Sequence, residues 1–222
     1  MVELDREKLN ILRLCPLFAG TDDDGVRRLL EAFDAKPGNY RKGEFLHNTE
    51  TPFPRFGFVL SGMAEACIDD INGNRVIMAD VVPGVTFGES LCYLGVEDSP
   101  VYVFAAEDTE VLWLSPEVLR SDDSEPFLSG IRKRFTSMLA RRTLYMNNRI
   151  QVLSKLSLRE KLITYFSELA SEAGARTFTI PLSREDMATY IGANRSAVSR
   201  EMAAMKKEGL IDYHMNTVKI LD

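Results

Sequence analysis

The chain changes its pattern of apolar and polar positions several times, and each change predicts a different kind of structure. Near the N-terminus, apolar residues recur at helical spacing in two short segments, Arg6 to Leu14 and Asp22 to Phe33. Thr21 is the expected N-cap of the second segment, whose first turn holds three aspartates where the helix dipole favours negative charge. The pattern predicts two short helices with a break at Pro16.

Between Lys36 and Ser115 the helical period is lost, and short apolar runs alternate with Gly, Pro, Asn and Asp. Asn72-Gly73 predicts a tight hairpin, because both residues tolerate positive φ. Many short strands with regular turns predict an antiparallel β-roll, that is, a double-stranded β-helix or jelly roll. The expected strands are Phe56–Leu60, Ala64–Ile68, Val76–Ala79, Val101–Phe104 and Val111–Leu114.

A long helical segment follows, from about Pro126 to Leu156. Apolar residues recur along it in steps of three, four and seven, and basic residues occupy the opposite face. About 30 residues of helix would extend about 45 Å, past a small barrel. The narrow stripe therefore favours a seam between two subunits over a helix packed on its own barrel. The residues expected at this dimer interface are Leu128, Ile131, Phe135, Leu139, Met146, Ile150 and Leu153.

Ser157 and Glu160 have the spacing of a capping box, which restarts a helix and places a hinge between Leu156 and Ser157. That helix is expected to run to Glu172 and to stop at Gly174. The break separates the long helix from everything that follows it.

The segment from Leu182 to Met202 has the spacing of a helix-turn-helix. Ser183, with Asp186 three residues later, opens a helix that Gly192 must end. Ala188 is small where two helices would touch, and Val198 would face back into the core. Two short strand runs follow, Leu210–Tyr213 and Val218–Leu221, joined by a turn in which Asn216 can adopt a left-handed conformation. They predict a wing.

The second helix of this pair, about Arg195 to Lys207, has a polar face that is free to enter a major groove. The arginine fork matches the O6/N7 pair of guanine, and serine can contact a base or a phosphate. Residues 194–207 hold four cations and one anion, although the chain has a net charge of −6. The residues expected to contact DNA are Ser183, Asn194, Arg195, Ser196, Ser199, Arg200 and Lys206.

Composition narrows the class of protein. Residues 1–149 carry 17 Lys and Arg against 24 Asp and Glu, whereas residues 150–222 carry 10 against 9, so any nucleic-acid contact must come from a local patch. The charged start and the absence of a long apolar run predict a cytoplasmic protein without a membrane segment. Cys15, Cys67 and Cys92 are odd in number and lack a CxxC pair, which favours buried thiols and no metal site.

Six short motifs follow one another along the predicted β-roll and the predicted helix-turn-helix. They are Lys42-Gly43-Glu44, Phe58-Val59-Leu60-Ser61-Gly62, Pro83-Gly84, Phe87-Gly88-Glu89, Asp108-Thr109-Glu110-Val111 and the run from Ile191 to Arg200. With these motifs the chain resembles the Crp/Fnr superfamily of transcription regulators over almost its whole length. The resemblance implies an α+β regulator, not an enzyme, that binds a palindromic operator in double-stranded DNA as a homodimer and works with RNA polymerase. The implied domains are a sensor β-roll (1–126), a dimerisation helix with hinge (127–156) and a winged helix-turn-helix (157–222).

The effector implied by the resemblance is a small molecule of unknown identity. In cyclic-AMP-binding members an Arg-Ser pair holds the phosphate, whereas the aligned pair here is Ser99-Pro100, and Met146-Asn147 replaces the adenine-contacting pair. Cyclic AMP is therefore not expected, because no guanidinium is available for its phosphate. An apolar or weakly acidic effector is expected to contact Phe87, Gly88, Glu89, Ser90, Leu139, Thr143 and Met146.

Three alternatives remain open. A haem- or redox-sensing regulator of the same fold would take axial ligands from His47, Cys67, Cys92 or Met146, but three scattered cysteines do not suffice for a four-cysteine iron–sulfur cluster. A cupin-like metalloenzyme would need several converging ligands, and the chain has two histidines, His47 and His214, in different predicted domains. A cyclic-nucleotide-binding module without DNA binding is opposed by the winged C-terminus.

Overall fold

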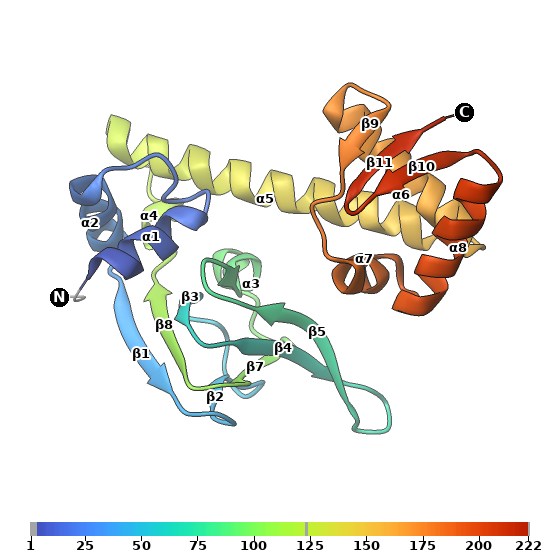
Figure 1. Cartoon of the computed structure of the whole chain (residues 1–222). Helices are drawn as coiled ribbons and strands as arrows, with labels where there is room; N and C mark the ends of the chain where they lie inside the picture. The colour runs from blue at the N-terminus through green and yellow to red at the C-terminus, as the bar shows by residue number, and fades with distance from the viewer. Residues whose placement is uncertain (1–3, 123, 222) are drawn as a thin grey trace. The chain divides into compact units, whose positions relative to one another are not determined.

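The structure, a computed structural model, describes residues 4–122 and 124–221, which form two compact units (Figure 1). Unit 1 is Met1–Met138 and unit 2 is Leu139–Asp222. The division falls inside the long helix α5 (Pro126–Leu153), which ends three residues before the predicted limit. Each unit has its own core, as expected for two domains.

Unit 1 begins with the two predicted helices, α1 (Arg6–Leu14) and α2 (Asp23–Ala32). The predicted N-cap of α2 was wrong by one residue: the side chain of Asp22, not of Thr21, accepts a hydrogen bond from the Gly25 amide at 2.8 Å. The Thr21 hydroxyl instead donates to the Phe18 carbonyl at 2.5 Å, so it is not free to cap.

Two antiparallel four-stranded sheets form the β-roll of unit 1, which confirms the predicted fold class. The first sheet has the order β1 (Lys36–Tyr40), β8 (Thr109–Leu114), β3 (Phe56–Ser61) and β6 (Thr86–Phe87). The second has the order β2 (Phe45–His47), β7 (Tyr102–Ala105), β4 (Ala64–Asp69) and β5 (Arg75–Val81). The five predicted strands are all present. The strands β1, β2 and β6 were not predicted, because they are short or contain Pro and Gly.

The predicted hairpin joins β4 to β5, and Gly73 adopts the left-handed conformation there with φ +77°. Edge-to-face aromatic pairs pack the N-terminal segment onto the roll. The ring centroids of Phe18, which follows α1, and Phe58 are 5.8 Å apart, and those of Phe33, at the end of α2, and Phe56 are 5.7 Å apart. Two short helices, α3 (Glu89–Leu94) and α4 (Glu117–Arg120), complete the unit.

The N-terminal half of α5 belongs to the core of unit 1, which corrects part of the predicted dimer stripe. Ile131 and Phe135 are only 1% and 4% exposed, and the Phe135 ring packs against Phe56 and Tyr93 at 6.0 and 5.8 Å. Side chains buried within their own subunit have almost no surface left for a partner. In the C-terminal half, Met146 and Ile150 are 55% and 61% exposed.

Unit 2 contains α6 (Leu158–Ala173), α7 (Arg184–Ile191) and α8 (Arg195–Lys207) around one hydrophobic core. The Ser157–Glu160 capping box and the glycine stop at Gly174 are both present as predicted. A three-stranded antiparallel sheet has the order β10 (Ile211–His214), β11 (Thr217–Ile220) and β9 (Thr177–Thr179). The strand β9 was not predicted, because its three residues carry little pattern of their own.

The β10–β11 hairpin is the predicted wing, but its turn differs from the prediction. Met215, not Asn216, takes the left-handed conformation, with φ +50°. The Asn216 carbonyl accepts a hydrogen bond from the Ile180 amide at 2.8 Å, which ties the turn to the strand β9 region. In the described part of the chain, no helix has the length and apolar character needed to cross a membrane.

Candidate nucleic-acid interface

The turn between α7 and α8 is set by three residues of the predicted motif. The Ser183 hydroxyl caps α7 by accepting from the Asp186 amide at 3.1 Å, and Gly192 ends the helix with φ +68°. The Ala193 amide then donates to the carbonyl of the buried Ala188 at 2.9 Å. Because a left-handed residue reverses the chain within one position, α8 can begin at Arg195.

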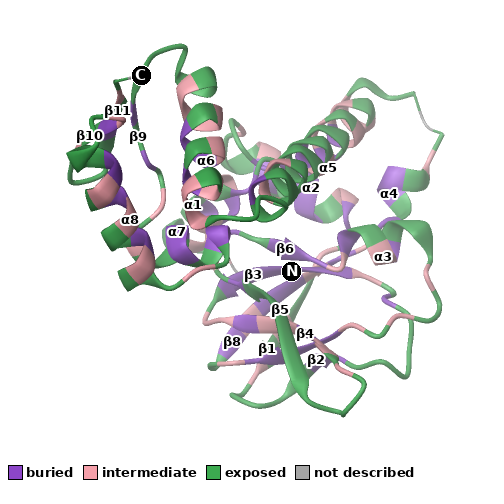
Figure 2. Cartoon of the chain, turned by 90° about the vertical axis from the view of Figure 1, so that its right-hand side faces the viewer, coloured by how far each residue is buried: buried purple, intermediate pink, exposed green. Residues whose placement is uncertain are grey.

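Helix α8 has one buried and one exposed side (Figure 2). Val198, Met202 and Met205 are buried in the core of unit 2. The residues predicted to contact bases or phosphates on this helix are exposed: Arg195, Ser196, Ser199 and Arg200. Asn194 occupies the N-cap position, but its side chain makes no capping hydrogen bond, so the amide is free for another contact.

The Arg200 guanidinium has no ion-pair or hydrogen-bond partner among the residues that the structure describes. Arg195 lies 3.9 Å from Glu185, a contact between two exposed side chains that carries little energy. A helix that presents an unpartnered arginine next to exposed serines can donate hydrogen bonds to base edges without first breaking an internal ion pair.

Arg159, at the start of α6, holds α8 in place, and the sequence reasoning missed it. Its Nε lies 2.6 Å from Glu201, and its Nη atoms lie 2.6 and 2.9 Å from the two Glu208 oxygens. These hydrogen bonds hold the pKa of the Glu208 carboxyl below its usual range. The guanidinium thereby pairs with Glu201 of α8 and with Glu208 at the C-cap of the helix, and it orients α8 against α6. Pairs 42 and 49 residues apart leave no local signal in a sequence.

The wing is fastened to the two helices by cations. The Arg184 guanidinium donates to the Met215 carbonyl at 2.7 Å and lies 5.5 Å from the Tyr213 ring, and burial lowers its pKa. Lys206, predicted to contact DNA, pairs with Asp212 of β10 at 2.6 Å. This ion pair is half exposed, so water competes for both groups and a phosphate can displace the carboxylate.

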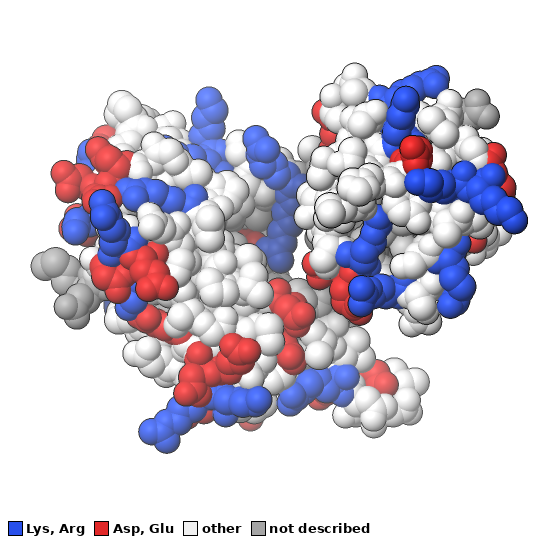
Figure 3. Space-filling model, viewed as in Figure 1, with Lys and Arg blue, Asp and Glu red and all other residues white. Residues whose placement is uncertain are grey.

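Charge is distributed unevenly over the surface. Figure 3 shows that basic side chains outnumber acidic ones on the displayed face of unit 2, whereas acidic and basic side chains mix on unit 1. The exposed cations of α8 and the wing include Arg195, Arg200, Lys207 and Lys219. A local basic surface of this kind attracts the phosphate backbone even when the whole chain is acidic.

The residues predicted to contact an effector are divided between the two units, and they stay a prediction. In unit 1, Phe87 and Glu89 are buried, and Ser90 is exposed. The Phe87 ring occupies the space beside Gly57, where a Cβ would lie only 2.1 Å from it. Leu139, Thr143 and Met146 belong to unit 2.

Of the candidate haem ligands, His47, Cys67 and Cys92 are buried in unit 1, whereas Met146 is exposed. The buried Nε2 atom of His47 forms no hydrogen bond with any described residue. His47 stacks on Phe53 with 3.5 Å between ring centroids, and burial lowers its pKa. Cys15, Cys67 and Cys92 are buried free thiols, as predicted. Burial raises the pKa of Cys15 and of Cys92 to about 11, which leaves them unreactive near neutral pH. In the described residues, no three His, Cys, Asp or Glu side chains gather as metal ligands.

Two families match this chain. The Crp-like helix-turn-helix domain matches residues 160–222, and the cyclic nucleotide-binding domain matches residues 37–121. The chain is 27% identical to the transcriptional activator protein anr of Pseudomonas aeruginosa, over 82% of this chain and 75% of that protein. It is 24% identical to the CRP-like cAMP-activated global transcriptional regulator of Mycobacterium tuberculosis, over 96% of this chain and 95% of that protein. The crystal structure of the catabolite activator protein of Thermus thermophilus superposes on this chain with a TM-score of 0.51 and 24% sequence identity, over 92% of this chain and 93% of that one.

Proposed function

This chain belongs to the Crp/Fnr superfamily of transcription regulators, and we propose that it binds a palindromic operator in double-stranded DNA as a homodimer under the control of a small-molecule effector. It is not an enzyme, because its two domains and its relatives are those of transcription regulators. The cupin-like alternative is therefore set aside.

The observation that carries the proposal is the two-sided helix α8. Its apolar side is buried, while Arg195, Ser199 and Arg200 are exposed on the other side. A helix-turn-helix contacts bases with the N-terminal part of its second helix, which is where these residues lie. Lys206, Lys207 and Lys219 are suited to phosphate contacts that set the register.

Dimer formation is proposed to use the exposed part of α5. Leu139, Thr143, Met146, Ile150 and Leu153 follow one another at spacings of four, three, four and three residues, which is the heptad pattern of a coiled-coil seam. Two such chains would place two recognition helices about 34–36 Å apart, one turn of DNA. RNA polymerase is the proposed further partner, and the cytoplasm the proposed location.

The proposed effector is a small molecule other than cyclic AMP. One relative is named as a cAMP-activated regulator, but Ser99-Pro100 offers no guanidinium for a cyclic phosphate. The proposed contacts remain Phe87 to Ser90 of unit 1 and Leu139, Thr143 and Met146 of unit 2. An effector that binds one conformation better than another would shift the population of DNA-binding-competent dimers.

The test of DNA reading is Arg200→Ala, measured by gel-shift titration against operator and random DNA. The operator is first selected from a random pool by the wild-type protein. Loss of a guanine contact should weaken the binding free energy for the operator by about 1–3 kcal/mol and leave the binding free energy for random DNA nearly unchanged. The control, Lys207→Ala, should weaken binding to all sequences and reduce the salt slope by about one. An unchanged ratio of specific to non-specific affinity in Arg200→Ala would refute the assignment.

A further inference from the structure

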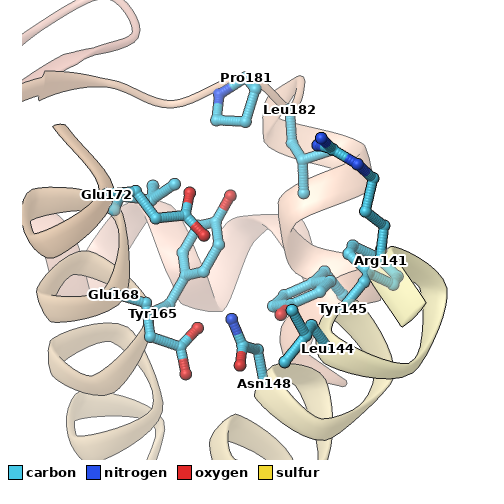
Figure 4. Close-up of a pocket in the computed structure, with 11 residues that line it drawn as sticks. Arg141, Leu144, Tyr145, Asn148, Tyr165, Glu168, Glu172, Pro181 and Leu182 are labelled. Atoms are coloured by element: carbon cyan, nitrogen blue, oxygen red, sulfur yellow. The ribbon is translucent and has the colours of Figure 1, made fainter. Parts of the chain in front are cut away.

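Unit 2 contains a cavity that the DNA-reading residues do not use (Figure 4). It has a volume of about 370 Å³ and lies among α5, α6, α7 and the Pro181-Leu182 loop. Pockets for small molecules usually have about 300–1,000 Å³ and combine apolar walls with a few polar groups. This cavity has both the size and the mixed lining.

One wall of the cavity is aromatic. Tyr145 of α5, Tyr165 of α6 and Tyr190 of α7 all line it. The Tyr145 and Tyr190 ring centroids are 5.5 Å apart, and those of Tyr165 and Tyr190 are 5.0 Å apart. Several tyrosine rings around one space attract a cation through their electron-rich faces.

Two polar atoms of the cavity lining lack a partner. The Tyr165 hydroxyl and Glu168 Oε1 are buried, and neither forms a hydrogen bond with any described residue. Tyr165 as a whole is only 4% exposed. Buried polar groups in native proteins are nearly always hydrogen-bonded, so the unpaired Glu168 oxygen and the unpaired Tyr165 hydroxyl each point to a missing partner in the cavity.

The charge of the cavity is negative. Glu168 and Glu172 lie one turn apart on α6 and extend toward α5, from which Tyr145 and Asn148 extend (Figure 4). The two carboxylates outnumber the one lining cation, Arg141. Burial, and then the charge of Glu172, raises the pKa of Glu168, because its ionised form lacks sufficient compensation. A cation at this place would supply that compensation.

We propose that this cavity binds a small organic cation, a protonated amine carried on an apolar or aromatic body. The ammonium group would donate to the Glu168 carboxylate, and the body would lie against the rings of Tyr145 and Tyr190. Since Tyr190 belongs to α7, the bound amine would restrain the first helix of the helix-turn-helix against α6. This regulatory consequence rests on the proposed DNA-binding function, whereas the binding itself does not.

The test is isothermal titration of the full chain with 2-phenylethylamine, and with phenylacetate and 2-phenylethanol as anionic and neutral matches. The amine should bind and the other two should not. Glu168→Gln and Tyr145→Leu should each weaken amine binding at least about tenfold. Tyr145 is 53% exposed, so its replacement leaves the core intact. Glu185→Gln removes an exposed carboxylate outside the cavity and should leave the affinity unchanged.

Absence of amine binding, equal binding of phenylacetate, or unaltered affinity in both Glu168→Gln and Tyr145→Leu would overturn the proposal. Thermal unfolding shows which variants are folded. If Glu168→Gln does not fold, Tyr145→Leu still tests the proposal, because Tyr145 is exposed. Gel shifts on the same proteins separate the two hypotheses. A chain that binds the amine but not DNA contradicts the proposed function, and one that binds DNA but not the amine contradicts this inference.

Discussion

Gly192→Ala tests whether the left-handed turn between α7 and α8 limits the stability of the DNA-reading unit. Gly192 has φ +68°, and an added Cβ would lie 3.1 Å from Leu153 Cδ2. A left-handed L-residue costs about 1–2 kcal/mol. Because Leu153 contributes only the end of a flexible side chain, the contact adds little, and backbone strain dominates.

A cost of about 1–2 kcal/mol corresponds to about a 5- to 30-fold change in the opening equilibrium. Hydrogen exchange of the full chain, followed by mass spectrometry, should show this loss of protection in peptides from residues 160–221. Peptides from residues 36–115 should exchange as in the wild type. The matched control is Gly174→Ala, with φ +61° and no atom near its added Cβ, which reports the strain alone.

Gly192→Ala and Gly174→Ala should therefore reduce the free energy of unfolding of unit 2 by nearly the same amount. Wild-type protection in Gly192→Ala would refute the argument that strain at this turn is costly. A loss far greater than in Gly174→Ala would show that the Leu153 contact, not the backbone, is decisive. Gly192→Asn should fall between wild type and Gly192→Ala, because asparagine tolerates the left-handed region.

Three further outcomes are expected. Met146→Glu and Ile150→Glu should yield monomers in sedimentation velocity, because each places a charge in the proposed seam. Gln151→Glu, which lies outside the heptad positions, should remain dimeric. Dimers in all three variants would show that the interface does not lie on this part of α5. Unfolding can be followed by the fluorescence of Trp113, the single tryptophan. The free energy of unfolding should fall as the pH drops through about 6.5, because burial lowers the pKa of His47 in the folded chain while the unfolded chain binds the proton. His47→Gln should weaken this pH dependence, and the same pH dependence in His47→Gln and wild type would disprove the role of His47. Titration with cyclic AMP should release no binding heat, and micromolar binding that strengthens operator affinity would reverse the effector proposal.

Most elements of this fold could be predicted from local sequence. The capping box at Ser157, the cap at Ser183 and the stop at Gly192 are all present as expected. Such signals are readable because they depend on hydrogen bonds within three or four residues and on backbone conformations that few residue types adopt. The strands with an apolar run were predicted for a similar reason, whereas β1 and β9 acquire their strand structure from neighbours far along the chain.

The polar face of α8 was also predicted from sequence, because helical periodicity assigns Val198 and Arg200 to different sides. Periodicity could not decide what covers an apolar stripe. The α5 pattern continues through both halves of the helix, yet Phe135 is buried within its own unit while Ile150 is exposed. Only the position of the β-roll beside the first half of α5 separates these cases, because burial depends on contacts between distant residues.

By itself, the sequence determined the class of protein: a β-roll, a long helix and a winged helix-turn-helix in a fixed order, with the arginine and serine residues that face outward on α8. The tertiary structure decided which groups hold that helix and which are left unpaired. Arg159 pairs with Glu208, 49 positions away, and the Tyr145 ring packs on Tyr190 in the wall of a cavity that no local pattern marks. Such contacts arise from chain packing rather than from neighbouring residues, so they become visible only once the chain is folded.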